Sequence, residues 1–129
     1  MSIIDHISIG TSDFKRAVAF YDAVLAALGY ERVAFYEEYF AAGYGEKGGP
    51  ASFWVGSPQS GEPASAGSGA HYCFKAPSQD AVNTFYDTAI KMGATCNGKP
   101  GPRPHYSDAY YGGFVIDHDG NKLEAVCFA

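Results

Sequence analysis

The sequence has no run of basic residues, and charge of either sign is sparse. Charged residues make up 18% of its 129 positions, and nine Lys plus Arg are outnumbered by fourteen Asp plus Glu, which gives a net charge of −5. A protein that binds a nucleic-acid backbone needs clustered positive charge to neutralise phosphates. This composition therefore excludes nucleic acid as an expected partner.

Long apolar runs are missing as well. No stretch approaches the roughly 20 apolar residues that are needed to cross a bilayer. The opening segment MSIIDHISIG lacks the basic flank and long apolar core of a secretory signal. We therefore expect no membrane partner and a cytoplasmic location.

Cysteine is scarce, but apolar residues are not. The three cysteines, Cys73, Cys96 and Cys127, are odd in number, widely spaced and free of any C-x-x-C pair. This argues against a disulfide framework or a structural zinc site and fits a reducing compartment. A hydrophobic content of 47%, with 16% aromatic residues, is enough to build the core of one compact domain.

A segment near the start of the chain recurs in its second half. A shift of 65 positions lays HISIGTSDFKRAVAFYD (6–22) on HYCFKAPSQDAVNTFYD (71–87) without a gap, and the triplet FYD appears in both. Each copy is typical of a short strand, a capping residue and an amphipathic helix. We interpret this as an internal duplication, in which the Phe and Tyr of FYD anchor each helix to its own sheet and the Asp is a polar surface residue.

The remaining elements follow from periodicity and turn residues. The first half has strands at 3–10 and 51–56, a helix that ends at Gly29, and two strands within 30–45. The second half has a strand at 71–76, a helix that ends at Gly93, a short strand and long loop over 94–111, and a hairpin of 112–117 with 122–128.

These elements predict an α+β fold of two tandem βαβββ modules. The first module spans residues 1–56 and the second spans 70–129. The segment between them, SPQSGEPASAGSG (57–69), has the composition of a flexible linker. His118, in the turn DHDGN of the last hairpin, is expected to be exposed.

Three residues in this pattern are candidates for a shared polar site. His6 and His71 begin equivalent strands, and Glu124 lies on a strand with apolar neighbours on both faces. A single His is more often a packed or edge residue than a ligand, and a buried carboxylate is commonly paired with Lys or Arg. Because pseudo-twofold packing would bring both histidines to a central cavity, a metal is the favoured partner of Glu124. Two imidazoles and one carboxylate leave coordination positions open for substrate.

The segments DHISIGTSDFKRAVAFYD, GAHYCFKAPS and DHDGNKLEAV together resemble the vicinal oxygen chelate superfamily, which includes glyoxalase I, extradiol dioxygenases, fosfomycin-resistance transferases and bleomycin-binding proteins. The third segment is similar to the motif D-P-D-G-N-x-x-E, with His118 in place of Pro. The resemblance implies that the sheets curl into a cup, an incomplete barrel, around one divalent metal ion (Fe, Mn, Ni or Zn). It places the metal ligands at His6, His71 and Glu124.

One departure from the family pattern concerns the strand ASFWVG. Glyoxalase I-type members carry a fourth ligand there, usually Glu, whereas this chain has Phe53 and Trp54. The three-ligand pattern is more similar to the dioxygenase and fosfomycin-resistance branches. We expect Phe53 or Trp54 to stack on a planar substrate, with ordinary core packing as the alternative. Cys73, on the face of His71, either lines the pocket or fills the core.

The segment GPRPHYSDAYYGG (101–113) is expected to form a loop that closes over the cup. In this interpretation His105, Tyr106 and Tyr110 are the catalytic candidates, and Arg103 and Tyr111 line the substrate pocket. The alternative is a proline-stiffened surface loop whose polar groups are solvated.

Two classes of function fit these features. The first is a metal-dependent enzyme that acts on a small oxygenated molecule, with dioxygenase, lyase or thiol-transferase chemistry. The second is a non-catalytic protein that binds a drug or metabolite, as bleomycin-resistance proteins do. A structural dimer module with a vestigial site is a third possibility. Exposed edge strands favour a homodimer, and the site is built either within one chain or across two.

Overall fold

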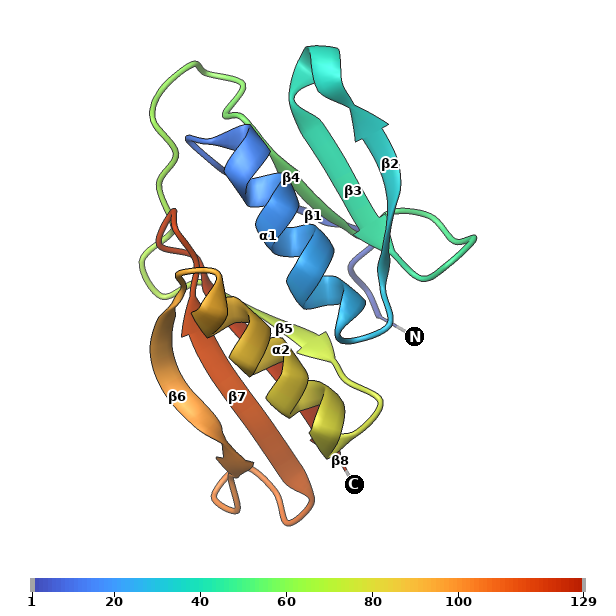
Figure 1. The fold of residues 1–129 in the computed structure, drawn as a ribbon, viewed down its shortest axis with the longest axis vertical. Helices are drawn as coiled ribbons and strands as arrows, with labels where there is room; N and C mark the ends of the chain where they lie inside the picture. Colours follow the sequence, from blue (N-terminus) through green and yellow to red (C-terminus); the bar gives the residue numbers. More distant parts are fainter. Residues whose placement is uncertain (1, 129) are drawn as a thin grey trace.

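The computed structural model describes residues 2–128, which form two α-helices, one short 3₁₀ helix and eight strands (Figure 1). The strands make two four-stranded mixed sheets that do not close into a barrel. This confirms the α+β class and the two βαβββ modules that the duplicated sequence predicts.

The first module contains a four-stranded sheet and one helix. Its elements are β1 (Ile7–Gly10), α1 (Phe14–Ala26), β2 (Glu31–Tyr36), η1 (Glu37–Tyr39), β3 (Ala41–Gly45) and β4 (Phe53–Gly56). The strand order is β1-β4-β3-β2, with β1 parallel to β4 and the other neighbours antiparallel.

The second module repeats this topology. Its elements are β5 (His71–Lys75), α2 (Gln79–Lys91), β6 (Thr95–Pro102), β7 (Tyr110–Ile116) and β8 (Lys122–Phe128). The order is β5-β8-β7-β6, and β5 runs parallel to β8. The segment expected to be a short strand and a long loop instead forms an eight-residue strand, because prolines are tolerated on the edge strand β6. Only residues 103–109 remain between β6 and β7.

Both helices begin at a capping side chain. Asp13 accepts a hydrogen bond from the Arg16 amide at 3.1 Å, and Ser78 accepts one from the Ala81 amide at 3.1 Å. These caps satisfy amide groups that have no partner within the helix. Neither helix of the described chain has the length and apolar character that crossing a bilayer requires.

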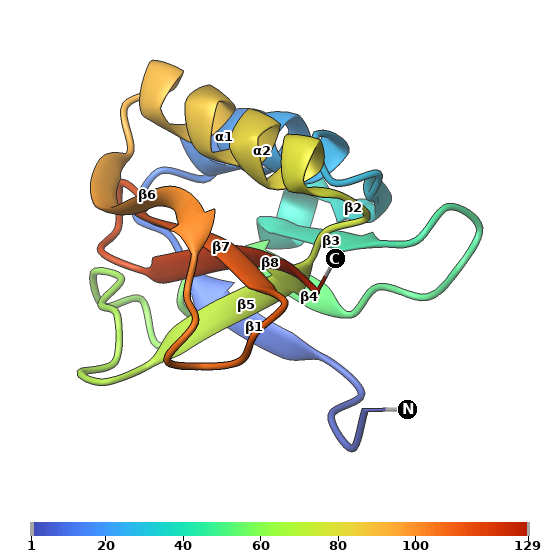
Figure 2. The ribbon, with the colours of Figure 1, turned by 90° about the horizontal axis from the view of Figure 1, so that it is seen from below.

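The two helices lie side by side on the same side of the two sheets (Figure 2). Their apolar faces and the sheet faces beneath them form one continuous core across both modules. Its fully buried members include Phe20, Val24, Tyr44, Val82, Phe85 and Leu123. The opposite face of each sheet points away from the helices, and the carboxylate of the first candidate site described below lies there.

The FYD triplet of α1 contacts the second module as well as its own sheet. The Tyr21 hydroxyl donates to the buried carboxylate of Asp117, in the last hairpin of the second module. The Phe20 ring packs against the His118 ring with centroids 5.4 Å apart. The expectation that these aromatic residues serve only their own module was therefore incomplete. Asp22 likewise accepts a hydrogen bond from the Tyr44 hydroxyl at 2.9 Å rather than being simply solvated.

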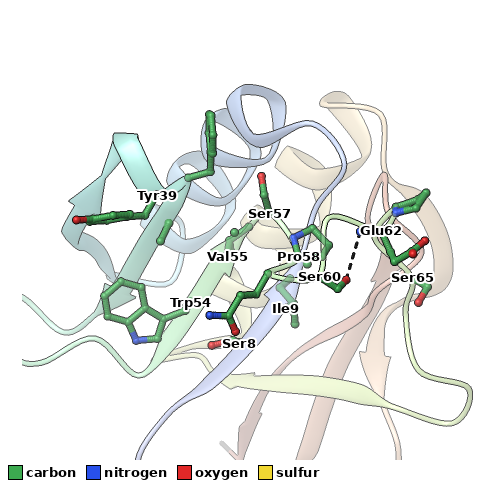
Figure 3. A pocket seen from close by; sticks show the side chains of 16 residues that line it. Ser8, Ile9, Tyr39, Trp54, Val55, Ser57, Pro58, Ser60, Glu62 and Ser65 are labelled. Atoms are coloured by element: carbon green, nitrogen blue, oxygen red, sulfur yellow. Dashed lines mark hydrogen bonds between the residues drawn. The ribbon is translucent and has the colours of Figure 1, made fainter.

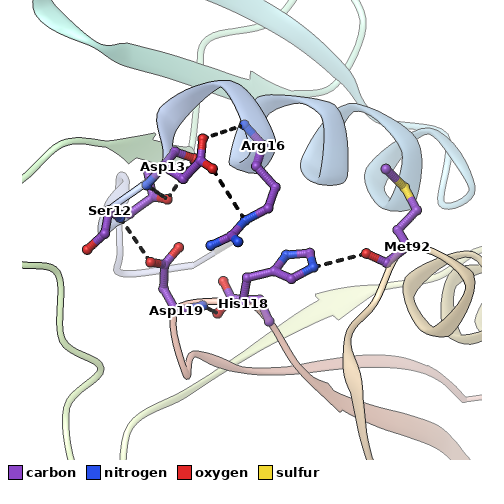
Figure 4. A network of polar contacts seen from close by, with 8 residues as sticks. Ser12, Asp13, Arg16, Met92, His118 and Asp119 are labelled. Carbon is purple, nitrogen blue, oxygen red and sulfur yellow. Dashed lines mark hydrogen bonds and ion pairs between the residues drawn. The ribbon is translucent and has the colours of Figure 1, made fainter.

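His118 is half-buried, which corrects the expected exposure. Its Nε2 lies 2.9 Å from the Met92 carbonyl oxygen at the end of α2 (Figure 4). Nearby, Asp119 accepts a hydrogen bond from the Ser12 amide at 2.9 Å. The turn DHDGN is thus held between both modules, because its side chains reach the start of α1 and the end of α2.

The connection between the modules contacts the first one. The Ala64 amide donates to Ser12 Oγ at 2.9 Å, and Pro58 and Ala64 approach Gly10 of β1. We retain the division of the chain at residues 57–69 as a proposal.

Candidate functional site

A buried carboxylate on β8 is the centre of the first candidate site. Glu124 is only 2% exposed. It lies opposite Cys73 of β5 and Phe114 of β7 in the sheet register. Strand alternation puts Leu123 and Ala125 in the core beneath the helices and turns Glu124 to the other face. The sequence predicted both the burial and this choice of face.

Three side chains from the neighbouring strands surround this carboxylate. His71 Nε2 lies 3.2 Å from Oε1, and the Tyr110 hydroxyl donates to Oε2. The Cys73 thiol also hydrogen-bonds to Glu124. We call these four residues, His71, Cys73, Tyr110 and Glu124, the Glu124 site.

A glycine makes room for the carboxylate. A Cβ atom on Gly112 would lie 3.0 Å from Glu124 Oε2 and 3.1 Å from the Tyr110 ring. Any larger residue at this position would push against both partners of the hydrogen bond. The sequence analysis did not single out Gly112. Two consecutive glycines, Gly112 and Gly113, in a predicted strand nevertheless indicate that another group packs closely against the backbone there.

The Cys73 thiol and the Tyr110 hydroxyl, which both face Glu124, have raised pKa values. Burial, the charge of Glu124 and the hydrogen bond to Glu124 together raise the pKa of the Cys73 thiol to about 12. Burial, followed by the hydrogen bond to Glu124, also raises the pKa of the Tyr110 hydroxyl well above its ordinary value. At neutral pH both groups are therefore proton donors to the carboxylate.

A cavity of about 650 Å³ adjoins this site. It lies between the modules, with Asp5 and Ile7 on one side and His71 and Cys73 on the other. Glu124 and Tyr110 do not line this cavity. A molecule in the cavity therefore contacts His71 and Cys73, which in turn contact the Glu124 carboxylate. The His71 side chain is 44% exposed and is accessible to such a molecule.

His6 is not assembled with the other two predicted ligands. It lies just before β1 of the first module, and its Nδ1 is 2.7 Å from the Asp5 carboxylate, in an exposed position. Within residues 2–128, no group of three or more His, Cys, Asp or Glu side chains is placed to hold a metal ion. Of the three predicted metal ligands, His71 and Glu124 lie close together and His6 does not. These residues therefore do not complete the three-ligand metal site that the resemblance implies, and we assign no chemical step to a metal.

The catalytic candidates of the segment 101–113 lie in different places in the structure. Tyr110 joins the Glu124 site, and its ring is in contact with Tyr106, which in turn packs against His105. His105 and Tyr106 are exposed and have no contact with Glu124 among the described interactions. They form an aromatic extension of the site rather than part of its centre.

Arg103 and Tyr111 are not among the residues that line the cavity beside His71, and their place in a substrate pocket stays a prediction. Arg103 donates to the backbone carbonyls of Lys99, Gly101 and Pro102, so it stabilises the β6–β7 connection. Tyr111 is on the helix side of β7, where its hydroxyl donates to Asn83 of α2 at 2.7 Å. Adjacent residues of a strand face opposite ways, so Tyr110 and Tyr111 cannot both reach one site.

Phe53 and Trp54 also lie on opposite faces of their strand. Phe53 is in the core, in ring contact with Tyr21 and Phe74, and it borders the cavity between the modules. Trp54 is on the face away from the helices and lines a different cavity, shown in Figure 3. Phe53 is thus a core residue that also lines a cavity, and its contact with a planar substrate stays a prediction.

The model of the Glyoxalase/Bleomycin resistance protein/Dioxygenase superfamily matches residues 3–125 of the chain. The chain belongs to this superfamily. A comparison with curated proteins found no match.

Solved structures of the superfamily share the fold. A glyoxalase/bleomycin resistance protein from Albidiferax ferrireducens T118 is 32% identical, with a TM-score of 0.85 over 97% of this chain and 98% of that one. The fosfomycin resistance protein of Listeria monocytogenes is 15% identical, with a TM-score of 0.67 over 98% and 93% of the two chains. A variant of glyoxalase I from Zea mays is 17% identical, with a TM-score of 0.70 over 95% of this chain and 44% of that one. The last two likenesses show the fold alone.

Proposed function

We propose that this superfamily member is an enzyme that acts on a small oxygenated organic molecule at the Glu124 site. The observation that carries the proposal is a carboxylate that is 2% exposed and yet has no Lys or Arg partner among the described residues. The buried carboxylate of Asp117 has no such partner among the described residues either, but it is held by Tyr21 and Asn121 and does not line the cavity beside His71. Glu124 instead faces a histidine, a tyrosine and a cysteine beside a cavity.

The chemistry assigned to these residues is proton transfer at an oxygen-bearing substrate. His71 can hydrogen-bond to a substrate oxygen in the cavity, since its side chain is partly exposed there. The His71 imidazole takes the proton that leaves the substrate at one ring nitrogen and passes the proton of Nε2 to Glu124, which later returns it by the same route. Tyr110 donates to the second carboxylate oxygen throughout and fixes its orientation, because the raised pKa keeps its hydroxyl protonated.

A divalent metal, if it is part of this function, would need a third donor besides His71 and Glu124. The resemblance assigns that place to His6, either of the same chain after it leaves Asp5 or of a second copy. In members that hold such an ion, the metal polarises substrate oxygens as a Lewis acid. The homodimer, the identity of the metal and the cytoplasmic location stay predictions.

The test compares wild-type protein with Glu124→Gln, which keeps the shape of the side chain and removes its charge. Turnover is screened with catechols, 2-oxoaldehyde–thiol adducts and phosphonates. We expect the variant to lose about 100-fold or more in turnover, the usual contribution of a general base, while its circular dichroism spectrum is unchanged. Glu38→Gln, an exposed change on η1, is the matched control and should have full activity. Full turnover by Glu124→Gln would contradict the proposal.

A second candidate is a binding protein without catalysis. It is favoured by the absence of a complete three-donor group within the described residues. Turnover of the screened substrates separates the two. Elemental analysis and thermal shifts with Mn(II), Fe(II), Ni(II) and Zn(II) show whether the protein also holds an ion, because an ion that binds the folded state raises its melting temperature. Ligand-induced stabilisation that is equal in wild type and Glu124→Gln, with no turnover and no metal, would support this candidate instead.

A further inference from the structure

The cavity between the modules has a charged end that the proposed activity does not use. The strand β5 lines it from His71, its first residue, to Lys75, its last. Four steps along an extended strand cover about 13 Å, at roughly 3.3 Å each. His71 belongs to the Glu124 site, so we treat the region around Lys75 as a second candidate site and call it the Lys75 end of the cavity.

Both modules contribute to the Lys75 end. The Tyr30 hydroxyl donates to the Lys75 carbonyl oxygen at 2.6 Å, so β5 ends beside the turn that follows α1 (Figure 1). Glu46, directly after β3, lines the same cavity. Burial, and after it the negative charge of Glu46, raises the pKa of the Tyr30 hydroxyl, as expected for a carboxylate nearby. A carboxylate of the first module and an ammonium group of the second therefore lie at one end of the cavity.

The charges of Glu46 and Lys75 are not neutralised within the chain. Among residues 2–128, neither side chain takes part in an ion pair. Asp5, the other carboxylate that lines the cavity, is already paired with His6. A ligand with a carboxylate alone would be repelled by Glu46, and one with an ammonium group alone would be repelled by Lys75. The arrangement therefore favours a ligand that carries both charges.

The middle of the cavity is aromatic. Phe53 of β4 and two residues of β5, Tyr72 and Phe74, line it. The Phe53 ring lies 5.0 Å from the Phe74 ring and 6.3 Å from the Tyr72 ring, centroid to centroid, and both contacts are edge to face. Such rings pack well against a further aromatic ring. An aromatic ring therefore fits between His71 and the Lys75 end.

We infer that the molecule bound in this cavity is an aromatic zwitterion, such as an aromatic amino acid. Its carboxylate contacts Lys75, its ammonium group contacts Glu46, and its ring lies against Phe53 and Phe74. The far side of the ring is directed toward His71. This inference rests on the proposed function, because it names the substrate class for the same cavity.

The test uses three probes that share a phenyl ring and differ in charge. L-Phenylalanine carries both charges, 3-phenylpropionate carries only the carboxylate, and 2-phenylethylamine carries only the ammonium group. Each is titrated into the full chain by calorimetry. We expect L-phenylalanine to bind about threefold or more tightly than either of the others, the gain of one additional exposed charge pair.

Two variants assign each charge to its partner. Lys75→Gln should weaken L-phenylalanine and 3-phenylpropionate by about threefold and should not weaken 2-phenylethylamine. Glu46→Gln should weaken L-phenylalanine and 2-phenylethylamine and should not weaken 3-phenylpropionate. Lys15→Gln on α1 and Glu38→Gln on η1, which do not line the cavity, are the matched controls and should bind all three probes as the wild type does.

Binding and turnover fail separately in this design. Glu124 does not line the cavity, so Glu124→Gln should bind L-phenylalanine with wild-type affinity. Full turnover by that variant would contradict the proposed activity and leave the order of affinities in place. Equal affinities for the three probes would overturn the inference, as would undiminished binding of L-phenylalanine in both Lys75→Gln and Glu46→Gln.

Discussion

Cys73 and Cys96 illustrate how the same residue type acquires opposite properties from its neighbours. Burial and Glu124 raise the pKa of the Cys73 thiol to about 12. A hydrogen bond from the Tyr86 hydroxyl and one from the Gly98 amide lower the pKa of the Cys96 thiol. The sequence shows both as free cysteines in strands, and nothing in the local pattern distinguishes them.

This difference predicts the order of alkylation by iodoacetamide. The thiolate is the reacting species, so with a pKa near 12 roughly one Cys73 thiol in ten thousand is reactive at pH 8. Cys96 should react first, Cys73 much more slowly, and buried Cys127 least, as peptide mass spectrometry would show.

The pH dependence follows with a definite sign. Between pH 7 and 10 the reaction of Cys73 should accelerate about tenfold per unit, because its thiol remains almost fully protonated there. Glu124→Gln removes the negative charge that helps to raise the pKa, so Cys73 should react faster in this variant at every pH. Faster alkylation of Cys73 than of Cys96 in the wild type would contradict the arrangement described here.

At the scale of single elements, the two helices end at equivalent glycines with different surroundings. Gly29 has φ +90° and Gly93 has φ +99°, in the region that favours glycine. A Cβ atom at Gly29 would meet nothing within 4 Å, whereas one at Gly93 would lie 2.9 Å from His118 Nε2. The duplication supplies a matched pair in which one position has an added contact.

Substituting each glycine by alanine separates the two effects. Gly29→Ala should lower the free energy of unfolding by about 1–2 kcal/mol, the cost of a positive φ for an L-residue. Gly93→Ala should cost more, because the new methyl group also displaces His118 from the Met92 carbonyl. Urea denaturation of both variants measures the difference. Equal losses would show that His118 moves aside freely.

Element predictions were most accurate where a periodic pattern was long. Helices over 14–26 and 79–91 follow from their apolar stripes and caps, and the paired strands of each module follow from alternation. The strand β6 was underestimated, since Pro100 and Pro102 argue against a strand in any local pattern. Its position at the edge of the sheet, where half of its amides need no partner, makes it possible.

At the scale of the whole molecule, the contact of Tyr21 with Asp117 joins the two modules. Asp117 is 7% exposed, and its carboxylate also accepts from the Asn121 amide at 2.8 Å and the Asn121 side chain at 3.0 Å. Burial and Asp117 raise the pKa of the Tyr21 hydroxyl, so it remains a donor over the whole accessible pH range. The motif DHDGN therefore has a structural task in addition to forming a turn.

Tyr21→Phe removes the donor and leaves the ring in place. We expect a loss of about 1.5–3 kcal/mol in the free energy of unfolding, typical of a hydrogen bond to a charged group. Urea unfolding followed by circular dichroism would measure it. Tyr39→Phe, at an exposed tyrosine whose hydroxyl has no described hydrogen bond, is the control and should change stability by less than about 0.5 kcal/mol. A Tyr21→Phe variant as stable as the wild type would show that the modules are held by apolar packing alone.

The sequence by itself determined the duplication, the α+β modules, the face of each strand that is buried and the burial of Glu124. These follow from local periodicity, which fixes whether a side chain points into the core or away from it. Only the tertiary structure decided which side chains meet. It brought His71 and Tyr110 to Glu124, turned His6 to Asp5, and set Trp54 and Phe53 on opposite faces. Such partners are far apart in the chain, and their meeting depends on how two sheets pack and twist against each other, a relation that no local pattern of residues encodes.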